Sequence, residues 1–107
     1  MAVKHLTKEN FAQELQVPGK HAVVDFYADW CGPCQGMKPI LEELSEECSE
    51  VAFYKVNVDE QQALAVQFGI SSIPTFCFFD GGALVQTVIG AQPKAQLVRV
   101  MEGRWMG

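Results

Sequence analysis

The chain has 107 residues, of which 49% are hydrophobic, and a formal net charge of −5 at pH 7. This length and composition suit one domain with a core that needs no metal or structural disulfide, so we expect a single α/β domain over residues 1–107. No stretch approaches the roughly 20 apolar residues of a membrane span, and the first residues lack a signal-peptide pattern. The acidic residues are scattered, which argues against nucleic acid or membrane as a partner. We expect a cytoplasmic protein.

The hydrophobic pattern switches between short apolar runs and amphipathic stretches, which is typical of an α/β fold. A short strand near Val3–Leu6 precedes a helix that we expect Thr7 to cap and Pro18-Gly19 to end. The nearly continuous apolar run His21–Ala28 predicts a central strand that is covered on both faces. Asp25 is the one acidic residue in that run.

A long helix is expected from Gly32 to Cys48, and Pro39 inside it predicts a kink because proline lacks the backbone N–H. Val51–Val58 is the next predicted strand. Asp59 and Gln62 have the spacing of a capping box, which predicts the start of a short helix.

Two further strands, Thr75–Phe79 and Ala83–Ile89, flank a glycine turn, and this arrangement predicts an antiparallel hairpin. Pro93 is expected near position N1 of the last helix. The apolar positions of that helix are spaced to pack on the sheet, and its end, including Trp105 and Met106, is expected to dock there.

Cys31 and Cys34 lie three residues apart at the predicted start of the long helix, so their sulfurs lie side by side on one helical face. Such a pair closes a small reversible ring. Unpaired N–H groups and a partial positive charge at a helix N-terminus favour the thiolate of Cys31. We therefore expect Cys31 to attack target disulfides and Cys34 to resolve the mixed disulfide.

Half of a zinc site and a pair of inert core cysteines are the alternatives for this motif. A four-cysteine zinc site needs a second ligand pair, but Cys48 and Cys77 do not form a Cys-x-x-Cys unit, and His5 and His21 lie in unrelated segments. We expect no metal. Cys77 is predicted to be a small buried hydrophobe, while Cys48 is expected to be partly exposed, and a regulatory or dimerising role for it stays open.

The segment Val24–Cys34, with the sequence VDFYADWCGPC, closely resembles the thioredoxin family of the Trp-Cys-Gly-Pro-Cys type. The resemblance extends from about Phe11 to the C-terminal helix. Further matching segments are Pro39-Ile40-Leu41, Lys55-Val56-Asn57-Val58-Asp59, Gly69-Ile70, Ile73-Pro74-Thr75 and Gly90. The resemblance implies the thioredoxin fold, a central mixed five-stranded sheet flanked by four helices, with the dithiol exposed at the end of the second strand.

Asp25 and Lys55 each interrupt an apolar strand, and a buried carboxylate is costly unless it is paired, hydrated or neutralised. Either each side chain points to an edge of the sheet, or Asp25 has a raised pKa and lies behind the dithiol. In the second case Asp25 takes the proton from Cys34 as that thiol attacks. The resemblance favours the second interpretation and puts Lys55 near the acid, where its charge limits the rise of the pKa.

The resemblance also implies that Pro74 is the family's cis-proline, which packs against the dithiol and excludes metal there. The backbone of Ile73 would then pair with an extended segment of the substrate. A flat, largely apolar contact surface around Cys31 is expected from Trp30, Gly32, Pro33, Ile73, Gly90 and Ala91. The chain departs from the family at Gln35-Gly36, where a basic residue is common, so we expect a modestly slower Cys31 thiol.

The function implied by the resemblance is a general protein-disulfide reductase in electron transport and cell redox homeostasis. It would be recharged by a flavin-dependent thioredoxin reductase that draws on NADPH, with no cofactor bound to this chain, and would act as a monomer. One alternative is an oxidase or isomerase of the same fold, although those relatives usually carry histidine where this motif has Gly32-Pro33. The other is a binding subunit whose redox cycling is incidental.

Overall fold

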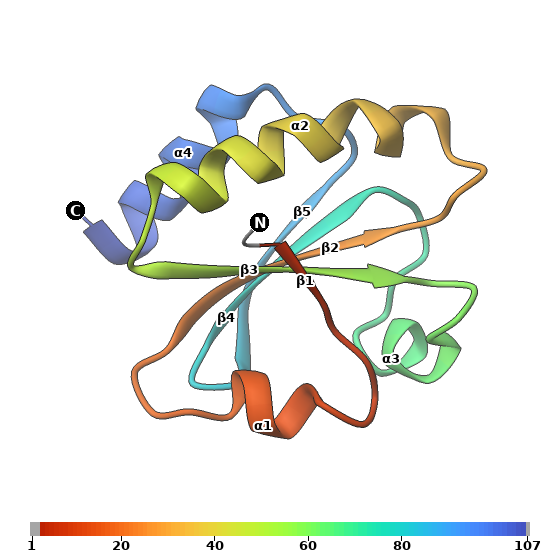
Figure 1. Cartoon of the computed structure of the whole chain (residues 1–107), viewed down its shortest axis with the longest axis horizontal. Helices are drawn as coiled ribbons and strands as arrows, with labels where there is room; N and C mark the ends of the chain where they lie inside the picture. Colours follow the sequence, from red (N-terminus) through yellow and green to blue (C-terminus); the bar gives the residue numbers. More distant parts are fainter. Residues whose placement is uncertain (1–2, 107) are drawn as a thin grey trace.

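The computed structural model describes residues 3–106, in which strands and helices alternate along the chain (Figure 1). The strands are β1 (Val3–His5), β2 (His21–Tyr27), β3 (Val51–Asn57), β4 (Thr75–Asp80) and β5 (Ala83–Ile89). The helices are α1 (Phe11–Leu15), α2 (Gly32–Glu47), α3 (Gln62–Gln67) and α4 (Lys94–Met101), and α4 continues into a π-helical turn, η1 (Glu102–Met106). Among residues 3–106, no helix is long and apolar enough to cross a bilayer.

The strands form one mixed sheet in the order β1-β3-β2-β4-β5. β3 runs parallel to both β1 and β2, whereas β4 runs antiparallel to β2 and β5. Figure 1 shows α2 and α4 on one face of the sheet and α1 and α3 on the other. The predicted fold, a mixed five-stranded sheet flanked by four helices, is confirmed.

The alternation of side chains along β2 explains why its sequence is apolar almost throughout. Val23 packs under α2 and α4 with Phe53 and Phe78, whereas Val24 and Phe26 belong to the core on the opposite face. A central strand that is covered twice has no solvent-exposed face. Asp25, two residues after Val23, therefore lies on the face beneath α2.

The prediction that Thr7 caps the first helix is wrong, because α1 begins only after Asn10. The Asn10 Oδ1 accepts a hydrogen bond of 2.7 Å from the Thr7 N–H, and the Thr7 hydroxyl accepts one of 3.2 Å from the Asn10 N–H. Each side chain thus accepts a hydrogen bond from the backbone N–H of the other residue, across a turn that precedes the helix.

The predicted capping box at Asp59 and Gln62 is also wrong. The residue before α3 is Gln61, and neither it nor Asp59 provides a side-chain cap. The Asn57 Oδ1 instead accepts the N–H groups of Asp59 and Glu60 at 2.9 and 3.2 Å, which shapes the turn into α3. The Asp59 carboxylate is held elsewhere, by the indole of Trp30.

The predicted hairpin is present, and Gly81 and Gly82 form its turn with positive φ angles of 60° and 92°. Gly82 also lies against α1, since a Cβ atom built on it would come within 2.7 Å of the Gln16 Cγ. Pro93 occupies the N-cap position of α4, next to the expected N1 position. Pro39 lies inside α2, where the expected kink stays a prediction.

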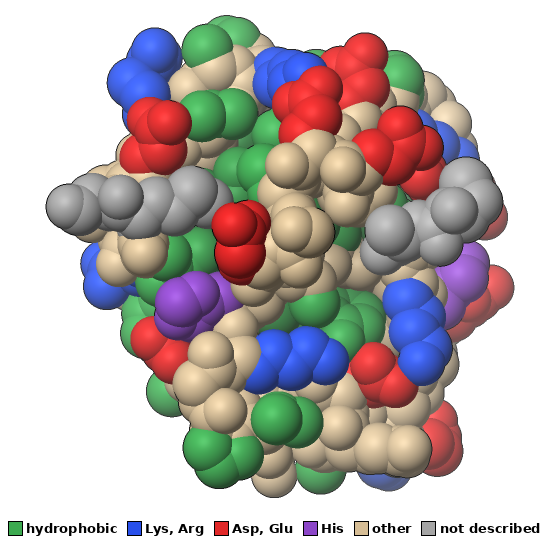
Figure 2. All heavy atoms as spheres, turned by 60° about the vertical axis from the view of Figure 1, so that its left-hand side comes forward, with side chains coloured by type: hydrophobic (Ala, Val, Ile, Leu, Met, Phe, Trp, Pro, Cys, Tyr) green, Lys and Arg blue, Asp and Glu red, His purple; other side chains and the backbone are tan. Residues whose placement is uncertain are grey.

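The acidic residues are not evenly scattered, because the second half of α2 carries four glutamates: Glu42, Glu43, Glu46 and Glu47. In the view of Figure 2, acidic side chains gather in the upper part of the molecule, where α2 lies. Lys94 of α4 links α2 to α4, with its Nζ 2.9 Å from Glu47 and 3.4 Å from Glu43.

The segment after α4 docks on the rest of the domain, as predicted. Trp105 stacks on His21 of β2 with ring centroids 4.6 Å apart. The Met106 side chain lies outside the described residues.

Candidate functional site

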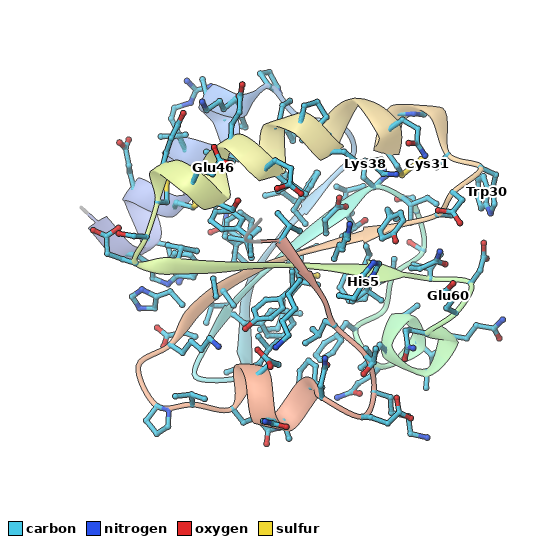
Figure 3. All side chains as sticks on the ribbon, in the orientation of Figure 1. His5, Trp30, Cys31, Lys38, Glu46 and Glu60 are labelled. Atoms are coloured by element: carbon cyan, nitrogen blue, oxygen red, sulfur yellow. A yellow bond between two sulfur atoms is a disulfide. The ribbon has the colours of Figure 1, made fainter. Side chains whose placement is uncertain are left out.

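Cys31 and Cys34 form a disulfide at the start of α2, just after the loop that follows β2, and their Cα atoms are 5.3 Å apart (Figure 3). Cys31 is the N-cap of α2 and has extended backbone angles, which lets its sulfur turn back over the first helical turn. The Cys34 N–H donates to the Cys31 Sγ at 3.2 Å. The helix N-terminus thus presents one of its free donors to this sulfur, which favours a negative charge there after reduction.

The two cysteines differ in accessibility, since Cys31 retains 5% of its residue surface and Cys34 only 1%. Both belong to a small apolar cluster with Tyr27 and Ala28, against which Ile73 packs. The Ile73–Pro74 peptide bond is cis, as the resemblance implies, and the Ile73 carbonyl oxygen lies 4.0 Å from the Cys31 Sγ.

A groove of about 320 Å³ opens beside the disulfide. Trp30 is 73% exposed along it, and its indole N–H donates to the Asp59 Oδ2 at 2.9 Å. The other lining residues come from the turn after β3 and the loop before β4: Val58, Ile70, Ser71, Ser72 and Ile73. The groove is mainly apolar with a polar rim.

The structure brings together most of the residues expected at this surface. Gly32, Pro33 and Ala91 are exposed, and the Gly90 N–H donates to the Pro74 carbonyl at 2.8 Å, which joins the end of β5 to the cis-proline loop. Among the groove residues, Val58, Ile70, Ser71 and Ser72 were not predicted as part of the site. Ile70, Ser71 and Ser72 directly precede Ile73-Pro74, and this adjacency is the signal in the sequence that could have indicated them.

Asp25 is buried on β2, with 3% of its surface exposed, and its register partner on β3 is Lys55. Since β2 lies between β3 and β4, the interpretation that Asp25 points to a sheet edge is wrong. Burial raises the pKa of Asp25 to about 7, while the charges of Lys55 and Lys38 lower it. Within residues 3–106, its Oδ1 finds no hydrogen-bond partner.

A cavity of about 50 Å³ adjoins Asp25, beneath the first half of α2. It is large enough for a water molecule. Its lining residues come from β1, β2, β3 and α2: Val3, Asp25, Tyr27, Lys38, Leu41, Glu42 and Lys55. Lys38, Leu41 and Glu42 were not predicted as part of the site, although Lys38 follows Cys34 by one helical turn and the other two share its face.

The remaining cysteines lie away from the disulfide. Cys77 has no exposed surface, which confirms that it is a buried hydrophobe, and burial raises the pKa of its thiol to about 11. Cys48 is half-buried at the end of α2, where burial and then the charges of Glu47 and Glu50 raise its pKa. A regulatory or dimerising role for Cys48 stays a prediction.

Comparison with known proteins agrees with this geometry. A thioredoxin family model matches residues 2–103. The thioredoxin of Alicyclobacillus acidocaldarius subsp. acidocaldarius is 50% identical over 97 residues, which span 90% of this chain and 91% of that protein. The chain belongs to the thioredoxin family. The thioredoxin of Streptomyces clavuligerus is 39% identical over 97 residues, or 91% of each chain. The crystal structure of Malassezia sympodialis thioredoxin, 38% identical, matches with a TM-score of 0.84 over 94% of this chain and 89% of that one.

Family membership and the disulfide together make this thioredoxin-family chain a thiol-disulfide oxidoreductase with protein-disulfide reductase activity. Its redox group is its own pair of cysteines, and the family exchanges electrons with disulfide substrates and a reductase. Within residues 3–106, no group of three or more His, Cys, Asp or Glu residues is arranged to hold a metal ion.

Proposed function

We propose that reduction of a target protein proceeds in two displacements at this site. The Cys31 thiolate attacks one target sulfur, which forms a mixed disulfide and releases the other target sulfur as a thiolate. Cys34 then attacks the Cys31 Sγ, which forms the Cys31–Cys34 disulfide and releases the second target thiolate. Two electrons pass to the target. The observation that carries these roles is the hydrogen bond from the Cys34 N–H to the Sγ of Cys31, which is the more exposed of the two cysteines.

Asp25 serves in this proposal as the base that accepts the Cys34 proton during the second displacement. A general base works best when its pKa lies near the working pH, and the Asp25 pKa of about 7 meets that requirement. The adjoining cavity supports proton transfer through a water molecule. Lys55 has a secondary role, since its positive charge keeps part of the Asp25 population ionised at neutral pH.

Target segments bind, in the proposal, along the groove beside Cys31. Trp30 and Ile73 supply apolar contact, and the backbone of Ile73 next to cis-Pro74 pairs with an extended segment. Gly32, Pro33, Gly90 and Ala91 complete the surface. Its largely apolar character suits contact with many different proteins, which supports a general reductase.

The proposed electron source is a flavin-dependent thioredoxin reductase that draws on NADPH. The chain would act in the cytoplasm, because a dithiol reductant is kept reduced in a reducing compartment. We also propose that residues 1–107 work as one domain and as a monomer. The family match over residues 2–103 supports the single domain.

The roles of the cysteines are tested with Cys31→Ser and Cys34→Ser variants, and with Cys48→Ser as the matched control. Cys31→Ser is expected to abolish reduction of a disulfide substrate. Cys34→Ser is expected to accumulate the mixed disulfide, which is detected on gels under non-reducing conditions. Cys48→Ser is expected to keep full activity. If Cys34→Ser turned over like the wild type, Cys34 would not be the resolving thiol.

The direction of electron flow is tested by the equilibrium reduction potential of the Cys31–Cys34 pair in a dithiol buffer. A general value for thioredoxin is about −270 mV, and a potential near it supports a reductase. A potential near about −120 mV, typical of a strong disulfide-forming oxidant, would favour the oxidase alternative. Retention of biological activity by Cys31→Ser would favour the binding subunit.

A further inference from the structure

Lys38 connects the helix that carries the redox pair to the cavity that holds Asp25. It follows Cys34 by four residues, so it lies one helical turn further along α2. Its side chain lines the cavity together with Leu41 and Glu42, which come three and four residues later on the same helical face. Figure 3 shows Lys38 and Cys31 at the same end of α2.

The ammonium group of Lys38 is directed toward the site. Its Nζ lies 5.8 Å from the centre of the Tyr27 ring, and Tyr27 is itself a cavity residue and a member of the cluster around the disulfide. Among the described residues, Lys38 has no carboxylate within 4.0 Å, whereas Lys94 on α4 has two. The charge of Lys38 is therefore available to the cavity.

The charged and titratable groups around Asp25 come from three elements. Lys55 faces it from β3, Lys38 and Glu42 line the cavity from α2, and Tyr27 lies two residues along β2. The β4 register partner of Asp25 is the apolar Phe76, and Val3 is the β1 residue in the cavity. His5 pairs with Lys55 in the sheet but is exposed and does not line the cavity.

Of these groups, Lys55 and Lys38 both favour the ionised form of Asp25 against the effect of burial. Lys55 does so from within the sheet, and Lys38 from the solvent side of the cavity, where its residue is exposed. Because water screens an exposed charge, the effect of Lys38 is expected to be modest but measurable.

We propose that Lys38 is a positioning residue that stabilises the Asp25 carboxylate across the cavity and thereby sets the lower end of the pH range in which Cys34 resolves the mixed disulfide. The inference rests on the proposed role of Asp25 as the base. In that step the Cys34 Sγ gives its proton to Asp25, bonds to the Cys31 Sγ, and the target sulfur leaves with the electron pair of the broken bond. Removal of the Lys38 charge leaves fewer Asp25 side chains ionised at a given pH, so the step slows on the acid side.

The test compares the pH dependence of single-turnover disulfide reduction in the wild type, Lys38→Gln and Lys38→Arg. Lys8→Gln is the matched control, because it removes the same charge from an exposed residue that does not line the cavity. The Lys38→Gln variant is expected to resolve the mixed disulfide about 1.5- to 5-fold more slowly at pH 6 and to match the wild type above about pH 9. Lys38→Arg is expected to restore the wild-type profile.

Two further readouts identify the group that Lys38 acts on. The Asp25 carboxyl resonance, followed by ¹³C NMR, is expected to titrate roughly 0.2–0.7 pH unit higher in Lys38→Gln than in the wild type. The rate of Cys31 alkylation reports the ionisation of the nucleophile and not the resolving step. Its pH dependence is expected to be the same in Lys38→Gln as in the wild type. An unchanged Asp25 titration, or an equal shift in Cys31 alkylation, would overturn the proposal.

An Asp25→Asn variant separates failure of this inference from failure of the proposed function. If Asp25→Asn loses the acid limb of the resolving step while Lys38→Gln behaves as the wild type, Asp25 is the base and Lys38 has no role. If Asp25→Asn keeps the wild-type profile, the role of Asp25 fails, and the inference about Lys38 falls with it.

Discussion

Replacement of Asp25 by asparagine is expected to stabilise the protein, and to do so increasingly as the pH rises. Burial raises the Asp25 pKa from 3.8 to about 7, so the folded state binds the proton more tightly than the unfolded state does. Stability from this group is therefore fully present below about pH 4 and is lost as the pH rises to about 7, since ionised Asp25 is penalised only in the folded state. Asparagine has the same shape and no such penalty.

The magnitude follows from the size of the shift. The pKa changes from 3.8 to about 7, a difference of about 3 units, and each unit corresponds to 1.36 kcal/mol. Above pH 7 the wild type is therefore less stable than it would be with a neutral side chain by about 4 kcal/mol. This is a large fraction of the 5–15 kcal/mol that is typical of a folded protein.

The assay is urea unfolding of the oxidised protein at a series of pH values from 4 to 9. The gain in unfolding free energy of Asp25→Asn over the wild type is expected to grow by about 4 kcal/mol between pH 4 and pH 8. Asp29→Asn, which removes the same charge from an exposed side chain, serves as the control. A difference between Asp25→Asn and the wild type that stays constant over this range would refute the reasoning.

Five other substitutions, at four positions, test packing and the contact surface. Gly36→Ala in α2 has open space for its methyl group, and in urea unfolding it is expected to raise the unfolding free energy by about 0.5–1 kcal/mol. Gly82→Ala is expected to lower the unfolding free energy by at least about 1 kcal/mol, because the φ of Gly82 is 92° and a Cβ there would meet Gln16. Trp105→Ala is expected to lower the melting temperature through the loss of about 3 kcal/mol of packing. Trp105→Phe is expected to cost much less, since the buried indole N–H has no hydrogen-bond partner in the described part of the chain. Trp30→Ala is expected to raise the KM for protein substrates while it leaves stability within about 0.5 kcal/mol, because this side chain is 73% exposed. Equal KM values for Trp30→Ala and the wild type would remove Trp30 from the contact surface.

The features that the sequence predicts well are those with a local physical cause. The apolar run of β2 requires cover on both faces, and the two glycines after Asp80 supply the positive φ angles of a hairpin turn. The spacing of Cys31 and Cys34 on a helix start is sufficient to predict their pairing. The cis form of Pro74, in contrast, follows from family resemblance and not from any local rule.

The errors fall where another residue, distant or nearby, takes up the side chain that the pattern assigns to a helix cap. Asp59 has the spacing of a helix cap, but the indole of Trp30, 29 residues earlier, holds its carboxylate. The Thr7 hydroxyl accepts a hydrogen bond from the Asn10 N–H instead of capping the helix. The helical pattern of the sequence does not predict this contact. Lys38 is missed for a related reason. Its cavity is lined by residues of four elements, and no sequence motif predicts that these residues come together.

The burial of Cys77 has a practical consequence for any experiment that labels thiols. Its side chain has no exposed surface, and its raised pKa of about 11 leaves almost no thiolate at neutral pH, so reagents reach it when the sheet opens. Where reclosing outpaces labelling, the rate at which Cys77 reacts measures the equilibrium between closed and open forms. Cys31 and Cys34 report the oxidation state in the same sample. A series of mass spectra taken over the labelling time therefore records both how oxidised the protein is and what fraction of it is open.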